Sequence, residues 1–297
     1  MDIRVSSGTA SHLELIKSRS LEPPTTAYLL IPGAPCRGGC VYCPQASSDG
    51  KWLSRVSWPS FRMDDILNPL EKSDLQRICI QSPDVDGYEE KVIHAVRTLE
   101  TTGKPVSVSA PPLPEDVLKE LKTCSVDRMG VGIDGVTDEL RSRTKRGYDP
   151  MIFWDYLGDT IQVFGEGRVT AHMIVGLGEE LEHVGHAVHR ASRIGANVSL
   201  FPYMFGKKEV DIRYYRKAQL LSYLIARGHG VHEAISLTHS YPHEVREYVE
   251  SGEPFRTAGC PGCNRPYYTT RPGKEHRNYP REPTWDEIRR IEADLRY

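Results

Sequence analysis

Three cysteines lie close together in the segment Pro35-Cys-Arg-Gly-Gly-Cys-Val-Tyr-Cys-Pro44. Cys36, Cys40 and Cys43 have the spacing C-x3-C-x2-C. Thiolates bind the irons of iron–sulfur clusters, and three of them leave one iron of a [4Fe–4S] cluster without a protein ligand. That iron can bind a substrate or cofactor directly, so the loop is a candidate active centre.

Two other chemistries explain these clustered cysteines less well. A structural zinc site needs four ligands, usually from two cysteine pairs, and the next cysteine, Cys79, belongs to a different expected element. A disulfide framework is typical of short secreted chains, whereas this chain has 297 residues and seven cysteines. We therefore interpret the three cysteines as cluster ligands.

The loop resembles the signature of the radical S-adenosylmethionine (radical SAM) enzymes, C-x3-C-x-aromatic-C, with Tyr42 in the aromatic position. In that family the open iron binds the amino and carboxylate groups of S-adenosylmethionine. Reductive cleavage then gives a 5′-deoxyadenosyl radical. The resemblance thus implies a [4Fe–4S] cluster with an open iron, S-adenosylmethionine and an electron donor.

Short apolar segments alternate with amphipathic ones, as is typical of βα units and a parallel sheet. The expected strands are 27–31, 77–81, 106–109, 129–133, 169–175 and 198–203. The expected helices are 88–100, 115–123, 138–143, 151–163, 180–194 and 210–227. Six βα units predict an α/β fold, a partial (βα)6 TIM-type barrel, which the resemblance also implies. The cysteine loop follows the first strand, and active groups of such barrels lie at the carboxyl ends of strands.

We expect three parts along the chain: an N-terminal extension, the radical SAM barrel, and a C-terminal extension with a second cysteine pair. Their boundaries are 1–26, 27–230 and 231–297.

Composition argues against two classes of partner. Lys and Arg number 38 against 40 acidic residues, a formal net charge of −2, so no overall positive field favours nucleic acid or a membrane surface. No segment has the ~18 consecutive apolar residues of a membrane span, and the first residues lack the apolar core of a signal peptide. We expect a cytoplasmic location, where unpaired cysteines stay reduced.

Two further segments match the family. Asp134 follows the fourth expected strand, where similar enzymes place a polar side chain against the ribose or methionine part of S-adenosylmethionine; a capping or loop carboxylate is the alternative. The fifth strand leads into Ile-Val-Gly-Leu-Gly-Glu179, and the similar stretch of many radical SAM enzymes lies near the adenine. Gly176 and Gly178 would let the backbone approach a flat ring, although an ordinary turn uses the same glycines.

Two positions near these segments stay open. His172 either faces the barrel interior or packs as a core residue. After the second strand the chain has Gln81-Ser-Pro-Asp84, where relatives often carry Gly-Gly-Glu, so the group that holds the methionine amine is not assigned.

A second cysteine pair, Cys260 and Cys263, lies in a segment rich in proline and glycine. Its C-x2-C spacing is typical of metal ligands. A thioredoxin-like redox pair is expected at a strand–helix junction instead, and zinc held by two ligands is a third reading. We interpret the pair as ligands of an auxiliary iron–sulfur cluster.

Cys79 is the expected third ligand of that cluster, because it resembles the second-strand cysteine that biotin synthase gives to its sulfur-donating cluster. Cys79 and Gln81 share one strand face, and if that face is the lumen, the pair can fold over the barrel mouth to meet it. A buried structural cysteine is the alternative, and Cys124 is expected to be structural. Nearby candidates for a fourth ligand are Arg265, Thr269 and Thr270.

An auxiliary cluster in such a barrel suggests sulfur insertion. In biotin and lipoyl synthases the radical removes hydrogen from an unactivated carbon, and the second cluster is consumed as the sulfur source. The tail, with Cys-x2-Cys, Arg-Pro-Tyr-Tyr268 and Asn278-Tyr-Pro-Arg281, resembles one protein of the two-component lipoyl synthases. The chain lacks the N-terminal C-x4-C-x5-C and the C-terminal Arg-Ser-x-Ser-Tyr of single-chain lipoyl synthase, which excludes that enzyme.

The resemblance implies an octanoylated carrier protein or peptide as substrate and a second radical SAM protein as partner. Residues 199–205 are candidates for apolar walls around the acyl chain, or for ordinary core. Four basic residues either face an acidic carrier protein or form a solvated helix face: Lys207, Lys208, Arg213 and Arg216. The alternative functions are another radical SAM enzyme, biotin-synthase-like or methylthiolating, and a non-catalytic iron–sulfur protein.

Overall fold

The computed structural model describes residues 1–18, 20–46, 50–205, 208–270 and 273–296. Its core is one sheet with the strand order β10-β9-β8-β7-β6-β2-β1-β5. The parallel strands are β2 (Thr26–Leu30), β6 (Arg77–Gln81), β7 (Val106–Ser109), β8 (Val126–Asp134), β9 (Val169–Val175) and β10 (Asn197–Pro202). All six expected strands are present, and the predicted α/β fold is confirmed.

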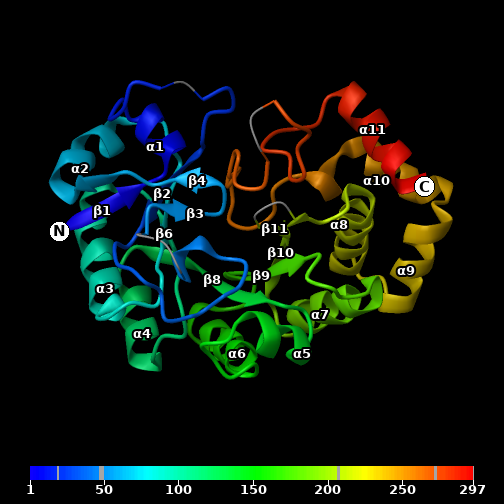
Figure 1. The fold of residues 1–297 in the computed structure, drawn as a ribbon, viewed down its shortest axis with the longest axis horizontal. Helices are drawn as coiled ribbons and strands as arrows, with labels where there is room; N and C mark the ends of the chain where they lie inside the picture. The colour runs from blue at the N-terminus through cyan, green and yellow to red at the C-terminus, as the bar shows by residue number, and fades with distance from the viewer. Residues whose placement is uncertain (19, 47–49, 206–207, 271–272, 297) are drawn as a thin grey trace.

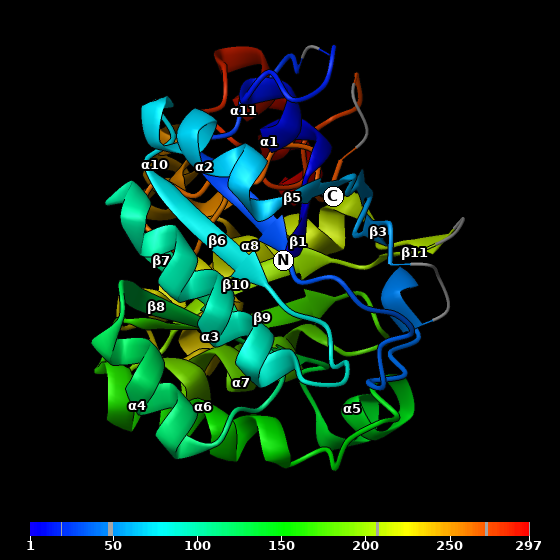
Figure 2. The ribbon, with the colours of Figure 1, turned by 90° about the vertical axis from the view of Figure 1, so that its left-hand side faces the viewer.

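A layer of helices covers the outside of this curved sheet (Figures 1 and 2). The helices that follow the parallel strands from β6 onward are α3 (Tyr88–Leu99), α4 (Glu115–Thr123), α5 (Asp138–Thr144), α6 (Ile152–Phe164), α7 (Leu181–Arg193) and α8 (Ile212–Ala226). Their ends agree with the expected ranges or differ by one or two residues. The agreement follows from their apolar periodicity: in α3, for example, Val92, Val96 and Leu99 are spaced along one face and fully buried.

The first residues extend the barrel sheet. Strand β1 (Asp2–Val5) pairs antiparallel with β2 and with β5 (Ser60–Arg62). Helices α1 (Ser7–His12) and α2 (Met63–Lys72) flank these strands. Part of the segment expected as an N-terminal extension therefore belongs to the same sheet as the barrel strands.

Two short hairpins stand beside each other at the carboxyl side of the strands. One consists of β3 (Trp52–Leu53) and β4 (Val56–Ser57), the other of β11 (Met204–Phe205) and β12 (Lys208–Glu209). Figure 2 places β3 next to β11. An ion pair of 2.7 Å between Arg55 and Glu209 joins the two hairpins.

The C-terminal region ends the fold with helices and a long irregular tail. Helices α9 (Val231–Ser240), α10 (His243–Ser251) and α11 (Trp285–Arg296) lie beside α8. Residues 256–284 have no helix or strand of their own where they are described, and they fill the opening of the arc of strands (Figure 1). None of the helices in the described ranges combines the length and apolar character that crossing a bilayer requires.

Contacts at β10 and β2 show how the tail fills that opening. The Ser199 hydroxyl donates to the Ala258 carbonyl at 3.0 Å, and the Asn278 amide donates to the Leu200 carbonyl at 3.0 Å. On the other side, the Arg265 backbone N–H donates to the Tyr28 hydroxyl at 2.7 Å. The tail thus bridges the two strands that a complete barrel would join directly.

The basic residues expected at a docking surface are not all available. Arg216 is fully buried at 0 % exposure, and its guanidinium donates to the Arg277 carbonyl at 2.7 Å. This excludes Arg216 both from a docking surface and from a solvated helix face. Lys208 and Arg213 are exposed, and Lys207 lies outside the described residues.

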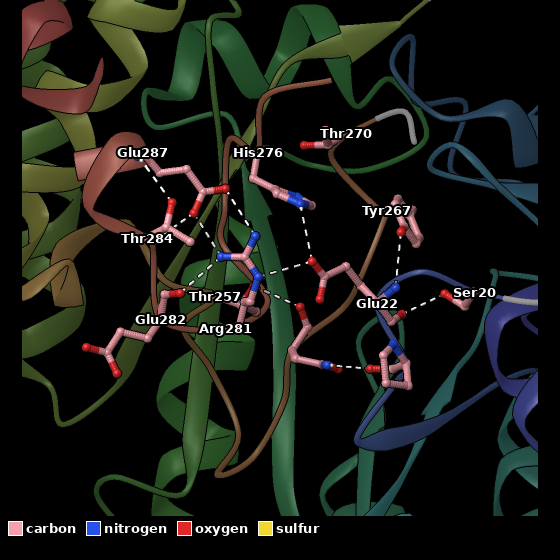
Figure 3. Close-up of polar contacts among 12 residues, drawn as sticks. Ser20, Glu22, Thr257, Tyr267, Thr270, His276, Arg281, Glu282, Thr284 and Glu287 are labelled. Carbon is pink, nitrogen blue, oxygen red and sulfur yellow. Dashed lines mark hydrogen bonds and ion pairs between the residues drawn. The ribbon is translucent and has the colours of Figure 1, made fainter. Parts of the chain in front are cut away.

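A network of polar contacts holds the tail against both the N-terminal segment and α11 (Figure 3). The Arg281 guanidinium binds both carboxylate oxygens of Glu287, at 2.8 and 3.1 Å, and one of Glu22, at 3.1 Å. The Glu22 backbone N–H donates to the Tyr267 hydroxyl at 3.1 Å. Arg281 therefore connects three separate segments of the chain.

This network makes stability depend on pH through Glu287. Burial raises the pKa of Glu287, but hydrogen bonds from Arg281 and the Thr284 backbone outweigh burial and lower it to about 2. The unfolded carboxyl has a pKa of about 4.3, so the stabilisation is fully present above that pH and is lost as pH falls toward 2. We expect Glu287→Gln to cost about 1–2 kcal/mol near neutral pH and progressively less in acid, as measured by urea unfolding.

The control is Glu115→Gln, because Glu115 pairs with Lys119 on the exposed face of α4, where such pairs contribute little. Equal pH dependence of wild type and Glu287→Gln would contradict the prediction.

Candidate functional site

A cavity of about 290 Å³ lies at the carboxyl ends of the barrel strands. Every parallel strand contributes to its wall, through Leu30, Gln81, Ser109, Asp134, Ile174 and Pro202. The three loop cysteines Cys36, Cys40 and Cys43 also line it. The cysteine loop is therefore at the end of the barrel where the sequence predicted the active groups. We call this space the upper cavity.

Backbone hydrogen bonds fix the cysteine loop over the strand ends. The Val41 N–H donates to the Thr144 carbonyl at 2.9 Å, and the Gly147 N–H donates to the Gly38 carbonyl at 3.0 Å. The last residue of α5 and the segment that follows it thus hold both sides of the loop.

The thiols face one shared space. A Cβ on Gly38 would lie 3.5 Å from the sulfurs of both Cys36 and Cys40, so a side chain there would compete with anything bound between them. All three cysteines are free and half-buried. Burial, followed by nearby Asp134, raises the pKa of Cys40 to about 11, and burial raises that of Cys43 to about 12. Metal binding would therefore displace protons from these thiols.

The arrangement fits a cluster better than a single ion. Among the described residues, no group of three His, Cys, Asp or Glu side chains is placed to hold one metal ion. A cluster needs its thiolates further apart, because each one binds a different iron.

Tyr42 and Asp134 are joined at the edge of this space. The Tyr42 hydroxyl donates to Asp134 Oδ2 at 2.6 Å, and Lys145 Nζ donates to the same oxygen at 2.8 Å. Thr137, not Asp134, caps α5, since its hydroxyl accepts from the Leu140 N–H at 3.2 Å. Asp134 is therefore not a helix cap: it is the last residue of β8, its carboxylate lines the upper cavity, and its contact with S-adenosylmethionine stays a prediction.

Two charged residues beside the loop were not singled out as site residues. Lys145 is 8 % exposed, with its ammonium 3.2 Å from the Phe153 ring centroid. The Asp84 carboxylate accepts from Arg37 Nε at 2.8 Å, and its backbone N–H approaches the Cys36 sulfur at 3.3 Å. Neither residue belongs to a spacing motif; only the position of Asp84, just after the second strand, pointed toward the site.

Gly176 and Gly178 both have positive φ, of 105° and 117°. A Cβ on Gly176 would lie 2.5 Å from the Val210 Cβ, so packing alone requires glycine there. The Glu179 carboxylate accepts from the backbone N–H groups of Gly176 and Leu177. Within the described residues, neither glycine lines the upper cavity, and approach to an adenine stays a prediction.

His172 faces the barrel interior and lines the upper cavity. Its ring packs against Phe201 with centroids 5.4 Å apart, and a Cβ on Gly130 would lie 2.6 Å from its Cε1. Burial, followed by Arg265, lowers the pKa of His172 to about 3. The ring is therefore a neutral part of the cavity wall.

The second cysteine pair meets Cys79 inside the barrel. Cys79 and Cys263 both pack against one apolar cluster, formed by Tyr28, Leu30, Val56, Trp58 and Tyr268. The Ser107 hydroxyl donates to the Cys260 sulfur at 3.2 Å, and the Cys263 sulfur lies 3.4 Å from the Tyr28 hydroxyl. Burial, followed by Cys260 and Cys263, raises the pKa of Cys79.

The position of this group differs from the sequence-based expectation. Ser107 is the second residue of β7 and pairs with Cys79 in the sheet, so Cys260 lies near the amino ends of the strands. The pair therefore meets Cys79 from within the barrel and not, as we expected from the sequence, by folding over the barrel mouth. The tail enters through the opening beside β10, which local sequence patterns do not show.

The candidates for a fourth ligand lie in different places. Burial raises the pKa of both Cys79 and Cys260, and Arg265 is close enough to offset part of that rise; its guanidinium stacks 4.4 Å from the Phe201 ring centroid. Thr269 lines the upper cavity, and the Thr270 hydroxyl accepts from the Arg277 N–H. Cys124 is the C-cap residue of α4, on the outer layer, as expected of a structural cysteine.

A family model, the radical SAM superfamily, matches residues 30–191, just over half of the chain. The chain belongs to this superfamily, which implies a [4Fe–4S] cluster and S-adenosylmethionine. Cys36, Cys40 and Cys43 are the residues that would hold the cluster. No curated protein sequence matches the chain.

The fold is similar to two solved structures of a hydrogenase maturase. The FeFe-hydrogenase maturase HydG from Carboxydothermus hydrogenoformans has a TM-score of 0.54 and 14% identity, over 69% of this chain and 52% of that one. A second HydG structure, a maturase of the [FeFe]-hydrogenase, has a TM-score of 0.55 and 13% identity, over 68% and 49%. The chain thus spans about half the length of these proteins, and the likeness shows a shared fold alone.

The pair of Asp134 and Lys145 gives a testable expectation. Asp134→Asn keeps a residue that tolerates the backbone φ of 58°, but it leaves the buried Lys145 ammonium without its carboxylate. We expect a loss of about 3 kcal/mol from the free energy of unfolding, measured by urea titration of the cluster-free protein.

The matched control is Asp64→Asn, which removes an exposed pair with Arg62 at 3.7 Å; its effect should stay below about 0.5 kcal/mol. Equal effects of the two substitutions would show that the buried pair contributes no more than a surface one.

Proposed function

We propose that this radical SAM protein inserts sulfur into an unactivated C–H bond of a protein-bound octanoyl chain, as in lipoyl synthesis. An auxiliary iron–sulfur cluster on Cys79, Cys260 and Cys263 would be the sulfur donor. The observation that carries the proposal is the convergence of these three cysteines, from β6 and the tail, inside the barrel. The residues fit such a group, since all three are free thiols, and binding a metal would displace the proton that burial and the two neighbouring cysteines favour on Cys79.

The walls of the upper cavity support an acyl substrate. Apolar side chains dominate the side nearest β10 and the hairpins, with Leu53, Ile174, Phe201, Pro202 and Met204 among the lining residues. Several of them come from the 199–205 segment, which favours its role as a wall over that of plain core. Burial of apolar surface is the main driving force for holding an alkyl chain.

Tyr268 lies at the boundary between the upper cavity and the second cysteine group. It lines the cavity, packs 5.2 Å from the Tyr28 ring centroid, and accepts a hydrogen bond from Gln81 Nε2 at 3.3 Å. With Trp58, which is fully buried, these rings cover the cysteines on the side of the upper cavity. An alkyl chain in the upper cavity would lie against Tyr268, next to the donor site.

When bound, the first cluster with S-adenosylmethionine supplies the radical that removes hydrogen, and the auxiliary cluster supplies sulfide. The chain itself contributes position and exclusion of water. Asp134, which Lys145 holds in place, accepts a hydrogen bond from Tyr42 of the cysteine loop, and the neutral His172 avoids placing a charge on the substrate side.

The proposal includes a carrier protein, an electron donor and a second radical SAM protein as partners. Two exposed aromatic side chains, Trp52 at 48 % and Phe205 at 38 % exposure, directly adjoin in the chain the residues Leu53 and Met204, which line the upper cavity. They belong to the two hairpins joined by Arg55 and Glu209. Exposed aromatic side chains next to cavity-lining residues suit contact with a carrier that presents an acylated lysine.

Iron content tests the auxiliary cluster. We expect Cys260→Ala/Cys263→Ala to retain roughly half of the iron of the anaerobically reconstituted wild type, because only one of two clusters is lost. The variant should still release 5′-deoxyadenosine with dithionite. Equal iron in both proteins would rule out the second cluster, and absence of 5′-deoxyadenosine from wild type would rule out the radical reaction.

The product tests the reaction itself. An octanoylated lysyl peptide, incubated with wild type and the second radical SAM protein, should gain one or two sulfur atoms by mass spectrometry. Cys79→Ala should abolish this gain while 5′-deoxyadenosine continues to form. An unchanged peptide would contradict lipoyl synthesis, and a gain of thiomethyl groups on another substrate would favour a methylthiolating enzyme.

A further inference from the structure

A second cavity opens on the opposite side of the barrel from the upper cavity. It has a volume of about 400 Å³ and is lined by Cys260 and Cys263. Thr25 and Gln76, which directly precede β2 and β6, also line it, so it lies at the amino ends of the strands. Within the described residues it shares no lining residue with the upper cavity. We call it the lower cavity.

The lower cavity leads to the surface. Gln76 and Arg256 in its wall are exposed. A further hollow of about 470 Å³, between β10 and α8, shares Arg256, Ala258 and Gly259 with it. Inside the barrel the lower cavity ends at the two cysteines, because Tyr268, at 6 % exposure, separates them from the upper cavity. Cys260 and Cys263 are therefore accessible from the lower cavity and covered on the side of the upper cavity.

We propose that the lower cavity is the entrance through which iron and sulfide reach the Cys260–Cys263 site. The auxiliary cluster would then be loaded from the barrel face opposite the acyl chain. This inference rests on the proposed function, since a cluster that gives up sulfide must be supplied again. A cation at the entrance, Arg256, suits anionic sulfur species such as hydrosulfide.

The side chain of Gln76 lies across this entrance. A Cβ on Gly262 would lie 2.5 Å from Gln76 Oε1, so the amide of Gln76 rests directly over the loop between the two cysteines. Gly262 has a φ of 73°, and the absence of a side chain there leaves room for Gln76. Because Gln76 is exposed, its size can change with little effect on the core.

Thiol alkylation in the metal-free, full-length chain measures access at each cysteine separately. With N-ethylmaleimide and peptide mass spectrometry, we expect Gln76→Trp to slow modification of Cys260 and Cys263 on the order of tenfold, and Gln76→Ala to speed it. Neither should alter the rates at Cys36 and Cys40. Met204→Trp, on the rim of the upper cavity, is the matched control and should slow the loop cysteines alone.

Unchanged rates at Cys260 and Cys263 in Gln76→Trp, or slower rates there in Met204→Trp, would overturn the proposed entrance. A second arm uses the chain in which all three loop cysteines are replaced by alanine, so that bound iron reports the auxiliary site. Iron uptake with sulfide should be slower in the Gln76→Trp form of this chain. Uptake that Gln76→Trp leaves unchanged contradicts the entrance alone, whereas absence of uptake in every form contradicts the auxiliary cluster itself.

Discussion

The unpaired edge of β10 is the constraint on which the rest of this structure depends. In a six-stranded parallel arc, the first and last strands do not pair with each other. A strand edge that is buried in the protein still needs hydrogen-bond partners for its backbone groups. The Leu200 carbonyl finds them in Asn278 and in the Tyr215 hydroxyl. The tail that satisfies this edge is the same segment that carries Cys260 and Cys263, so closure of the barrel and assembly of the second cysteine group are one event.

That coupling explains why buried charge gathers around the tail. The Arg216 guanidinium, with no exposed surface, donates to carbonyls of Arg277 and His276. Irregular backbone that enters a protein interior leaves carbonyl groups to be satisfied, and arginine has five donors to offer. On the outer side of the tail, the Arg281 guanidinium binds the carboxylates of Glu22 and Glu287. These two arginines hold a segment that has no regular hydrogen-bond ladder.

The sequence predicted those parts of the molecule that local patterns determine. Alternating apolar and amphipathic segments were enough for six strands and six helices, and the position of the cysteine loop after the first strand was enough to place Cys36, Cys40 and Cys43 at strand carboxyl ends. The resemblance to biotin synthase also associated Cys79 with the distant pair. How deep in the barrel the three cysteines meet depends on the path of the tail. No periodic pattern in the sequence specifies that path. The place of Lys145 beside the site and the burial of Arg216 could not be predicted for a related reason. The type of an isolated charged residue does not indicate which segments will pack over it.

The hydrogen bonds between the N-terminal segment and the tail have a consequence for the order of folding. The Asn264 side chain binds both the Thr25 N–H and the Pro23 carbonyl, pairs separated by most of the chain. Contacts of such sequence separation form late, because a long loop must close first. During synthesis the barrel strands are complete well before Cys260 emerges, and Cys79 then faces an open lumen. The protein therefore passes through a stage that already has its radical-forming loop and lacks its second thiol group.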